Sequence, residues 1–289
     1  MRVVAVGRFD GVHLGHRHLL AQARALAQAR RGSLLAYTFP PEPPALLPLA
    51  AKVRLLAALA DEVEVVPWER VRDLGAEEFL REEIGGRLGG RALVMGPDHR
   101  FGRGREAGPE QARALGERLG LEVLVVEPLR LEGEVVSARR IRELLAQGEV
   151  ERAARLLGRP PALLGRVVPG AGLARRLGFP TLNLALDPVL LRPADGVYLA
   201  WAFWPGGGGP GLFYQGKRPT FPGLPPSAEV HLFAPPPAGV AEVEVHLLAF
   251  LRPDQAFPTP EALAQQIARD AARAQALLAE VEPPRSLLL

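Results

Sequence analysis

The chain of 289 residues contains no cysteine. Disulfide bonds and thiolate metal sites are therefore excluded, which is compatible with a reducing compartment. No apolar run approaches the roughly 20 residues that a membrane-spanning helix needs. The first apolar run is short and is broken by Gly7, Arg8 and Asp10, unlike a signal peptide. We therefore expect a soluble, cytoplasmic protein that does not act at a membrane.

Lysine is also scarce: Lys52 and Lys217 are the only two, and arginine carries the remaining positive side-chain charge. The formal net charge is a mild +3, and acidic residues lie between the arginines. Such a surface has no continuous basic stripe, so we expect no nucleic-acid partner. The composition leaves open whether the chain forms a homo-oligomer. With 48% hydrophobic residues, the chain can bury one large core or two ordinary ones.

The first half of the sequence alternates between short apolar runs and helical patterns. This alternation predicts a parallel sheet that is covered by helices on both faces. The expected strands are Arg2–Val6, Ser33–Thr38, Val63–Val66, Ala92–Met95 and Leu121–Val126. The expected helices are His16–Arg31, Lys52–Ala60, Ala76–Leu88 and Pro109–Leu119, followed by Arg139–Gln147 and Val150–Leu157.

The pattern changes after Gly158, and we predict a boundary between domains 1–158 and 159–289. Short runs of Val, Leu, Tyr and Phe, separated by Gly and Pro, indicate antiparallel strands in a barrel or sandwich. We interpret the tetraglycine Gly206–Gly209 as a hairpin loop. The segment Pro260–Ala279 has apolar residues at helical spacing and predicts one closing helix.

The string GRFDGVHLGH, residues 7–16, fills the loop after the first expected strand. Ligands bind at this carboxyl edge in open α/β sheets, and a helix start favours a phosphate. Gly15 allows a close approach of phosphate to the backbone. His13 and His16 can donate hydrogen bonds to a phosphoryl group that gains charge in its transition state. A metal cluster with His18, or exposed histidines without a role, are the alternatives.

The wider pattern resembles the bifunctional riboflavin kinase/FAD synthetase family of bacteria, in which HxGH belongs to a nucleotidyltransferase domain. FDGVHLGH is similar to the family's first motif, and the strings TFPPEP, GPDHRFG and VSARRIR resemble three later ones. Three positions depart from the family pattern. Ala138 and Arg139 stand where hydroxyl residues are usual, and His99 replaces an aromatic residue. The loss of two hydroxyl donors would weaken phosphate binding, and Arg139 offers charge instead.

The second half contains GFPTLN, in which Thr181 and Asn183 lie on one face of an extended segment. Their neutral oxygens suit Mg²⁺ when nucleotide phosphates supply the negative charge, but the same string also fits an ordinary turn. The string resembles the magnesium site of the flavokinase domain. The segments DGVY, KRPTF and AEVH are similar to later flavokinase motifs, and AEVH contains Glu229, the general base that the resemblance implies.

The resemblance implies a Rossmann-like nucleotidyltransferase domain and a β-barrel flavokinase domain. The barrel would phosphorylate riboflavin to FMN with ATP, and the first domain would join FMN to AMP from a second ATP, which yields FAD. The implied catalytic residues are His13, His16, Arg142 and Glu229, with Mg²⁺ held by Thr181 and Asn183. The implied ATP-binding residues are Gly7, Phe9, Asp10, Gly11, Gly15, Ser137 and Arg175. The implied flavin-binding residues are Phe39, Pro43 and Asp98.

Three other functions stay compatible with the sequence. The first is a riboflavin kinase whose adenylyltransferase domain is impaired, because of Ala138, Arg139 and His99. The second is an adenylyltransferase for a pantetheine or nicotinamide precursor. The third is a regulator that binds a flavin or nucleotide without catalysis.

Overall fold

The computed structural model describes residues 1–170, 178–221 and 223–288, and its contacts divide the chain into two compact units. The first unit comprises Met1–Glu42 and Leu49–Ala138, and the second comprises Pro43–Pro48 and Arg139–Leu289. Helices α6 (Ala138–Ala146) and α7 (Val150–Leu157) thus group almost entirely with the second unit. The boundary near residue 158 marks a change in sequence pattern and stays a prediction. Within the described residues, no helix is long and apolar enough to cross a membrane.

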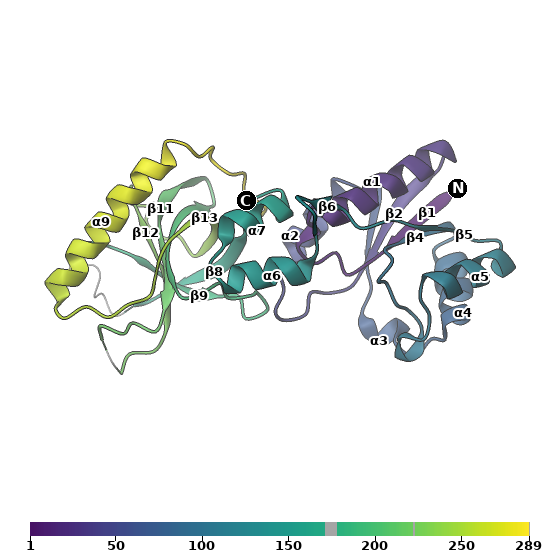
Figure 1. The fold of residues 1–289 in the computed structure, drawn as a ribbon, viewed down its shortest axis with the longest axis horizontal. Coiled ribbons are helices and arrows are strands. Elements are labelled where there is room, and N and C mark those ends of the chain that lie inside the picture. The colour runs from purple at the N-terminus through teal and green to yellow at the C-terminus, as the bar shows by residue number, and fades with distance from the viewer. Residues whose placement is uncertain (171–177, 222, 289) are drawn as a thin grey trace. The chain divides into compact units, whose positions relative to one another are not determined.

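The first unit contains a sheet of five parallel strands in the order β3-β2-β1-β4-β5 (Figure 1). The chain moves from β1 to β2 on one side and later to β4 on the other side of β1. The carboxyl ends of β1 and β4 therefore flank a switch point, which is the position at which open α/β sheets bind ligands. The strands are β1 (Arg2–Val6), β2 (Ser33–Thr38), β3 (Glu62–Val65), β4 (Gly90–Met95) and β5 (Glu122–Val125).

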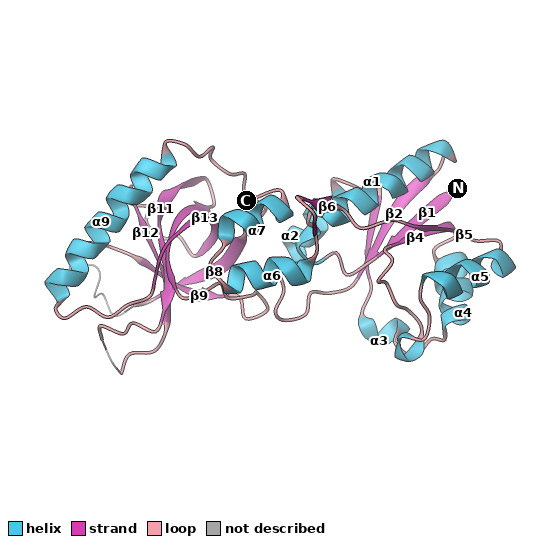
Figure 2. Cartoon of the chain, viewed as in Figure 1, coloured by secondary structure: helices cyan, strands magenta, loops and turns pink. Residues whose placement is uncertain are grey.

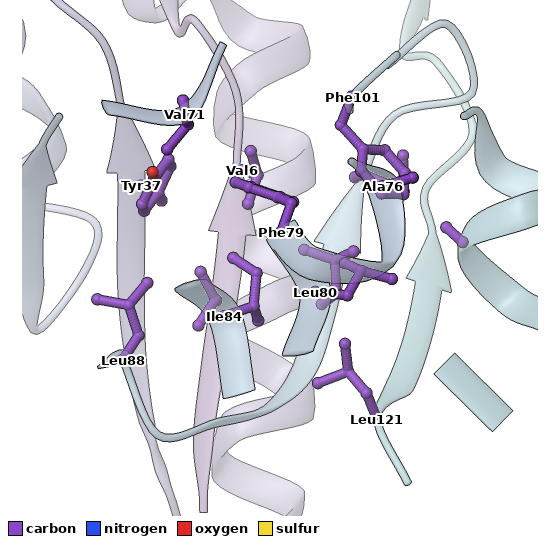
Figure 3. Packing of buried hydrophobic residues seen from close by; sticks show 14 of the residues in the cluster. Val6, Tyr37, Val71, Ala76, Phe79, Leu80, Ile84, Leu88, Phe101 and Leu121 are labelled. Carbon is purple, nitrogen blue, oxygen red and sulfur yellow. The ribbon is translucent and has the colours of Figure 1, made fainter. Parts of the chain in front are cut away.

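Helices cover both faces of this sheet, as the alternation in the sequence predicts. On one face, α1 packs on β1 and β2. On the other face, Phe79, Leu80 and Ile84 pack over alternate strand residues such as Val6 and Tyr37 (Figure 3). The helical segments are η1 (Asp10–Val12), α1 (Leu14–Ala29), α2 (Leu49–Ala57), α3 (Trp68–Val71), α4 (Ala76–Glu78), η2 (Phe79–Arg87), η3 (Arg103–Arg105) and α5 (Pro109–Leu119).

The second unit is built around a closed barrel in the strand order β10-β11-β12-β9-β8-β13, and helix α9 (Pro260–Leu278) packs on β10 and β11. Figure 2 shows α9 alongside the strands of this barrel. The expected fold class, a parallel α/β domain followed by an antiparallel barrel with a closing helix, is confirmed. The barrel strands are β8 (Ala162–Val168), β9 (Leu182–Leu186), β10 (Gly196–Trp204), β11 (Gly207–Gly216), β12 (Ser227–Leu232) and β13 (Glu242–Pro253). A short hairpin, β6 (Arg130–Leu131) and β7 (Glu134–Val135), precedes α6.

One local prediction is wrong. Three of the four glycines expected in a hairpin loop, Gly207–Gly209, lie in β11 and pair with β10. The turn between these strands needs two residues, Pro205 and Gly206, and Gly206 supplies the positive φ of 84°. Two-residue turns match the twist of the flanking strands, so the strand pairing extends into the glycine run.

Candidate active sites

The loop after β1 has an unusual backbone. Gly11 has φ 78°, which is easily adopted by glycine, but Phe9 and Val12 also have positive φ, at 47° and 41°. A β-branched residue such as Val12 rarely adopts this conformation, which costs on the order of 1–3 kcal/mol. Both side chains are buried, so packing holds the strained loop in place. Such strain concentrates at ligand-binding sites.

His13 caps the N-terminus of α1, and its Nδ1 accepts a hydrogen bond from the backbone N–H of His16 at 3.3 Å. Because Nδ1 is the acceptor, the neutral ring carries its proton on Nε2, which is the atom that can donate. The rings of His13 and His16 stack, with centroids 3.6 Å apart and planes inclined by 18°. The cap therefore fixes one donor direction at the positive end of the α1 dipole.

Position 15 requires glycine for a second reason, besides the close approach of a phosphate: a side chain here would clash with its neighbours. A Cβ at this position would lie 2.8 Å from the carbonyl oxygen of Val136 and 3.1 Å from the ring of His13. Any side chain would push away the segment that leads into Ser137. Gly15 therefore allows the loop after β1 and the Val136–Ser137 segment to lie against each other.

A cavity of about 470 Å³ opens at the carboxyl edge of the first unit's sheet. It receives residues from the loops after β1, β2, β4 and β5, which is the switch-point position. Asp10 and Gly11 belong to the loop after β1 but are not among the residues that line the cavity. The residues expected from the sequence that do line it are Gly7, Phe9, His13, Gly15, His16, Phe39, Asp98 and Ser137.

One side of this cavity is aromatic, a feature that the sequence motifs did not indicate. The ring centroids of Phe39 and Trp68 lie 5.4 Å apart, and those of Phe79 and Phe101 lie 5.7 Å apart. Trp68 is 41% exposed, which is high for so large an apolar side chain. The available signal was a tryptophan in a chain with only 6% aromatic residues. The aromatic side can receive a flat ring system.

His99 lines the same cavity and stacks on Phe101, with planes inclined by 20°. Burial, together with nearby Arg105, lowers the pKa of His99 to about 4. The imidazole is therefore neutral at pH 7 and presents an uncharged ring. The replacement of the family's aromatic residue by His99 is thus a mild change in chemistry.

Lys52 joins two of the loops that form the cavity. Its side chain is buried, and its Nζ donates to the carbonyl oxygens of Arg8, at 3.2 Å, and of Phe39. Burial lowers the pKa of Lys52 to about 8, and the negative charges of Asp10 and Glu42 counteract part of this effect. In the sequence, Lys52 is indistinguishable from an ordinary helix residue, because its acceptors are distant along the chain.

Two expected residues of this site lie in the other unit. Arg142 and Pro43 belong to the second unit, where Nε of Arg142 donates to the carbonyl oxygen of Pro44 at 2.8 Å. Arg139 forms an ion pair with Glu143 at 3.0 Å on the same helix. Arg175 lies outside the described residues. Their roles toward a nucleotide or flavin stay predictions.

The second unit has its own cavity, of about 130 Å³, at the barrel. Thr181 and Glu229 line it, and the Thr181 hydroxyl donates to Oε2 of Glu229 at 3.0 Å. The pairing of β9 with β12 places Asn183 opposite Glu229. The structure therefore brings together the two expected metal ligands and the expected general base.

Arg218, the arginine of the KRPTF string, completes this group, although the sequence analysis assigned no role to it. Its Nη2 lies 2.5 Å from Oε1 of Glu229 and 3.4 Å from Oδ1 of Asn183. The side chains of Arg218 and Glu229 are 13% and 15% exposed, so water screens their attraction weakly. The remaining described residues of the cavity include Phe179, Tyr214, His231, Asp254, Phe257 and Ile267.

Tyr214 and Asp254 hold the chain segment that carries Arg218. The Tyr214 hydroxyl accepts from the backbone N–H of Arg218 at 2.9 Å and donates to Asp254 at 3.1 Å. Asp254 also accepts from the backbone N–H of Lys217 at 2.9 Å. Burial raises the pKa of Tyr214, so its hydroxyl stays protonated and keeps both contacts.

Known proteins match both halves of the chain. A family model for FAD synthetase matches residues 1–140, and one for riboflavin kinase matches residues 157–278. The bifunctional riboflavin kinase/FMN adenylyltransferase of Pseudomonas fluorescens is 34% identical, over 96% of this chain and 93% of that protein. The protein of the same description from Escherichia coli K12 is 33% identical, over 97% and 94%.

A solved structure also matches across both units. It is described as a macrolide-efflux protein from Streptococcus pneumoniae and has a TM-score of 0.84 at 27% identity, over 97% of this chain and 94% of that one.

Fold and sites together define a two-domain transferase that uses nucleotides. The chain belongs to the family of bifunctional riboflavin kinase/FMN adenylyltransferases. The resemblance inferred from the sequence motifs is thereby confirmed, and the paired matches speak against an adenylyltransferase for another precursor and against a non-catalytic regulator.

Proposed function

We propose that the barrel unit phosphorylates riboflavin to FMN with ATP, and that the α/β unit transfers AMP from a second ATP to FMN. The second reaction releases pyrophosphate and yields FAD. The observation that carries this proposal is that each unit has its own cavity, and that each cavity is lined by residues suited to one of the two reactions. The domains would be 1–158 and 159–289. Because both reactions consume ATP, we place the enzyme in the cytoplasm, with ATP, riboflavin and FMN as small-molecule substrates.

In the kinase reaction, Glu229 accepts the proton of the ribityl hydroxyl while that oxygen attacks the γ-phosphorus of ATP. The bond between the γ-phosphorus and the bridging oxygen breaks, and ADP leaves. Thr181 and Asn183 are the residues that would hold Mg²⁺, since both offer neutral oxygens within the group around Glu229. The cation neutralises phosphate charge when bound.

In the adenylyl transfer, the phosphate of FMN attacks the α-phosphorus of ATP. The FMN phosphate is already ionised at neutral pH, so the reaction needs alignment and neutralisation of charge rather than a strong base. His13 donates from Nε2, His16 stacks on it, and the N-terminus of α1 adds its positive dipole. We assign Gly7, Phe9, Asp10, Gly11, Gly15 and Ser137 to the ATP of this reaction. Arg142 neutralises charge during the transfer, and Arg175 binds the ATP of the kinase reaction instead.

The aromatic side of the first cavity would receive the isoalloxazine ring of FMN. Phe39 and Trp68 offer ring edges and faces, and Asp98 lies at the same cavity. Pro43 follows this loop in sequence and completes the flavin-binding assignment. The neutral ring of His99 fits the same role, which favours a working adenylyltransferase over an impaired one.

Chromatography of the products formed from riboflavin, ATP and Mg²⁺ tests the proposal. The unaltered protein should form FMN first and FAD afterwards. The double variant His13→Ala, His16→Ala should accumulate FMN, with FAD formation at least about 100-fold slower, since one lost transition-state donor costs that much. If the unaltered protein forms FMN but no more FAD than the double variant, the adenylyltransferase half is impaired.

A further inference from the structure

Both carboxylate oxygens of Glu229, the proposed general base, accept hydrogen bonds from neighbouring side chains. Oε1 of Glu229 is held by Arg218 at 2.5 Å, and Oε2 accepts from the Thr181 hydroxyl at 3.0 Å. A charge-assisted contact with a guanidinium is stronger than an ordinary hydrogen bond. The guanidinium therefore shields Oε1 from a substrate hydroxyl, so this contact must open before Oε1 can receive a proton.

Arg218 also reaches the residue that we assign to the cation. Its Nη2 lies 3.4 Å from Oδ1 of Asn183, the amide oxygen that would bind Mg²⁺. One guanidinium thus places positive charge between the base and a metal ligand. A cation held by Asn183 would compete with Arg218 for this oxygen. The γ-phosphate of ATP offers oxygens that match the guanidinium fork.

The backbone at Arg218 supports a movement of the side chain alone. Its φ is +54°, a left-handed value that is strained for a residue with a side chain. The Tyr214 hydroxyl holds the Arg218 N–H, and Asp254 holds the N–H of Lys217. A strained backbone that is held by surrounding hydrogen bonds indicates that Arg218 must stand at this position. With the backbone held, rotation about the side-chain bonds can redirect the guanidinium.

The other arginine that lines the described part of this cavity is engaged differently. Nε of Arg252 donates to Asp270 at 2.8 Å, and its guanidinium carbon lies 5.4 Å from the ring centre of Phe257. That ion pair contacts neither Thr181 nor Glu229. Among the described arginines that line this cavity, Arg218 is therefore the one that contacts Glu229.

We propose that Arg218 is a catalytic residue of the kinase reaction, an inference that rests on the proposed function of the barrel. Before substrates bind, Arg218 pairs with Glu229 and Asn183. With Mg²⁺ and ATP bound, its guanidinium turns to the γ-phosphoryl group and neutralises charge during transfer. The oxygen–phosphorus bond to the ribityl group then forms, the bond to ADP breaks, and the proton passes to the freed Glu229.

The first test compares Arg218→Met, which keeps the length of the side chain and removes its charge, with Arg269→Met on the exposed side of α9. For Arg218→Met we expect a fall in kcat of riboflavin phosphorylation of about 100-fold or more, with the KM for riboflavin within a few-fold. Arg269→Met should match the unaltered protein. Conversion of supplied FMN to FAD should be unchanged in both variants, which shows that the first unit is intact.

A binding measurement separates contact with the γ-phosphate from a structural role. Calorimetry with Mg²⁺ and either ADP or a non-hydrolysable ATP analogue reports the two nucleotide sites without turnover. Arg218→Met should weaken the analogue at least 10-fold at one site and leave ADP within two-fold. Equal weakening of both nucleotides, or a kcat within three-fold of the unaltered protein, would overturn the proposal.

Arg218→Lys decides the question if Arg218→Met does not fold. Lysine keeps the charge but loses the fork, so we expect an intermediate kcat and a partial loss of the preference for the analogue over ADP. Unaltered values in Arg218→Lys would contradict a guanidinium-specific contact. If the unaltered protein formed no FMN at all, the proposed function itself would fail, and this outcome is separate from any effect of Arg218.

Discussion

At the scale of single residues, Lys52 shows how burial changes the pKa of an amine that connects two loops. Its amine is buried and donates to the carbonyl oxygens of Arg8 and Phe39, which connects the loops after β1 and β2. Burial lowers the pKa of Lys52 to about 8, from 10.5. We predict that this amine titrates near pH 8. The chain has only one other lysine, so a ¹⁵N-lysine NMR titration of the Lys217→Arg variant reads Lys52 alone.

The lowered pKa of Lys52 also predicts how stability depends on pH. Between pH 8 and 10.5 Lys52 holds its proton in the unfolded chain and not in the folded one, so the contribution of Lys52 to the free energy of unfolding rises with pH in this window. The full rise is about 3 kcal/mol, because a tenfold change in proton affinity corresponds to about 1.36 kcal/mol. In urea unfolding, this rise should be present in the unaltered protein and absent from Lys52→Met. A titration midpoint at or above pH 10 would contradict both expectations.

At the scale of elements, the buried carboxylate of Glu244 binds residues 286–288 to strand β13 of the barrel. Glu244 on β13 accepts from the backbone N–H groups of Leu287 and Leu288 and from the hydroxyl of Ser286, and it also contacts Nε2 of His246. Burial alone would raise the pKa of Glu244, but these hydrogen bonds outweigh it, and the pKa is lowered. The charged form of Glu244 thus holds residues 286–288 on β13.

We predict that Glu244→Gln lowers the free energy of unfolding of the barrel by about 2 kcal/mol, since the new amide nitrogen cannot accept these hydrogen bonds. Glu242→Gln, an exposed change on the same strand, should have little effect. Because the folded pKa of Glu244 is below the usual value, its contribution is present above pH 4.5 and is lost as the pH falls below it. The difference between the two variants should therefore disappear on acidification, which thermal unfolding followed by circular dichroism can measure. An equal loss in both variants would contradict the role of the carboxylate.

The elements also show what a sequence can predict. The parallel sheet was predictable because its central strands β1, β2 and β4 are mainly apolar, buried runs that alternate with helical segments. Individual barrel strands are harder to predict: β8 contains Gly165 and pairs with β13, and β9 pairs with β12, partners distant in the sequence. The motif residues of both sites were predictable in position. Lys52 and Trp68 were not, since their contacts join segments far apart in the sequence. The KRPTF string contains Arg218 but does not indicate its contact with Glu229.

At the scale of the whole molecule, the two candidate sites have separate lining residues. The cavity with His13 is lined by residues of the first unit, and the cavity with Glu229 is lined by residues of the second. Each reaction therefore has its own side chains. FMN, the product of one reaction and the substrate of the other, is a soluble phosphate that can leave one cavity and enter another.

This separation predicts that two defective proteins complement each other in solution. The variant His13→Ala, His16→Ala should convert riboflavin to FMN only, and Glu229→Gln should convert supplied FMN to FAD but form little FMN itself. Mixed with riboflavin, ATP and Mg²⁺, they should produce FAD after a lag that shortens as the concentration of the first variant rises, because free FMN must accumulate first. Chromatography over time measures this, and each variant alone at the doubled concentration is the control. If the first variant forms FMN but keeps it bound, so that the mixture forms no FAD, FMN does not pass through solution, and the two sites depend on being in one chain.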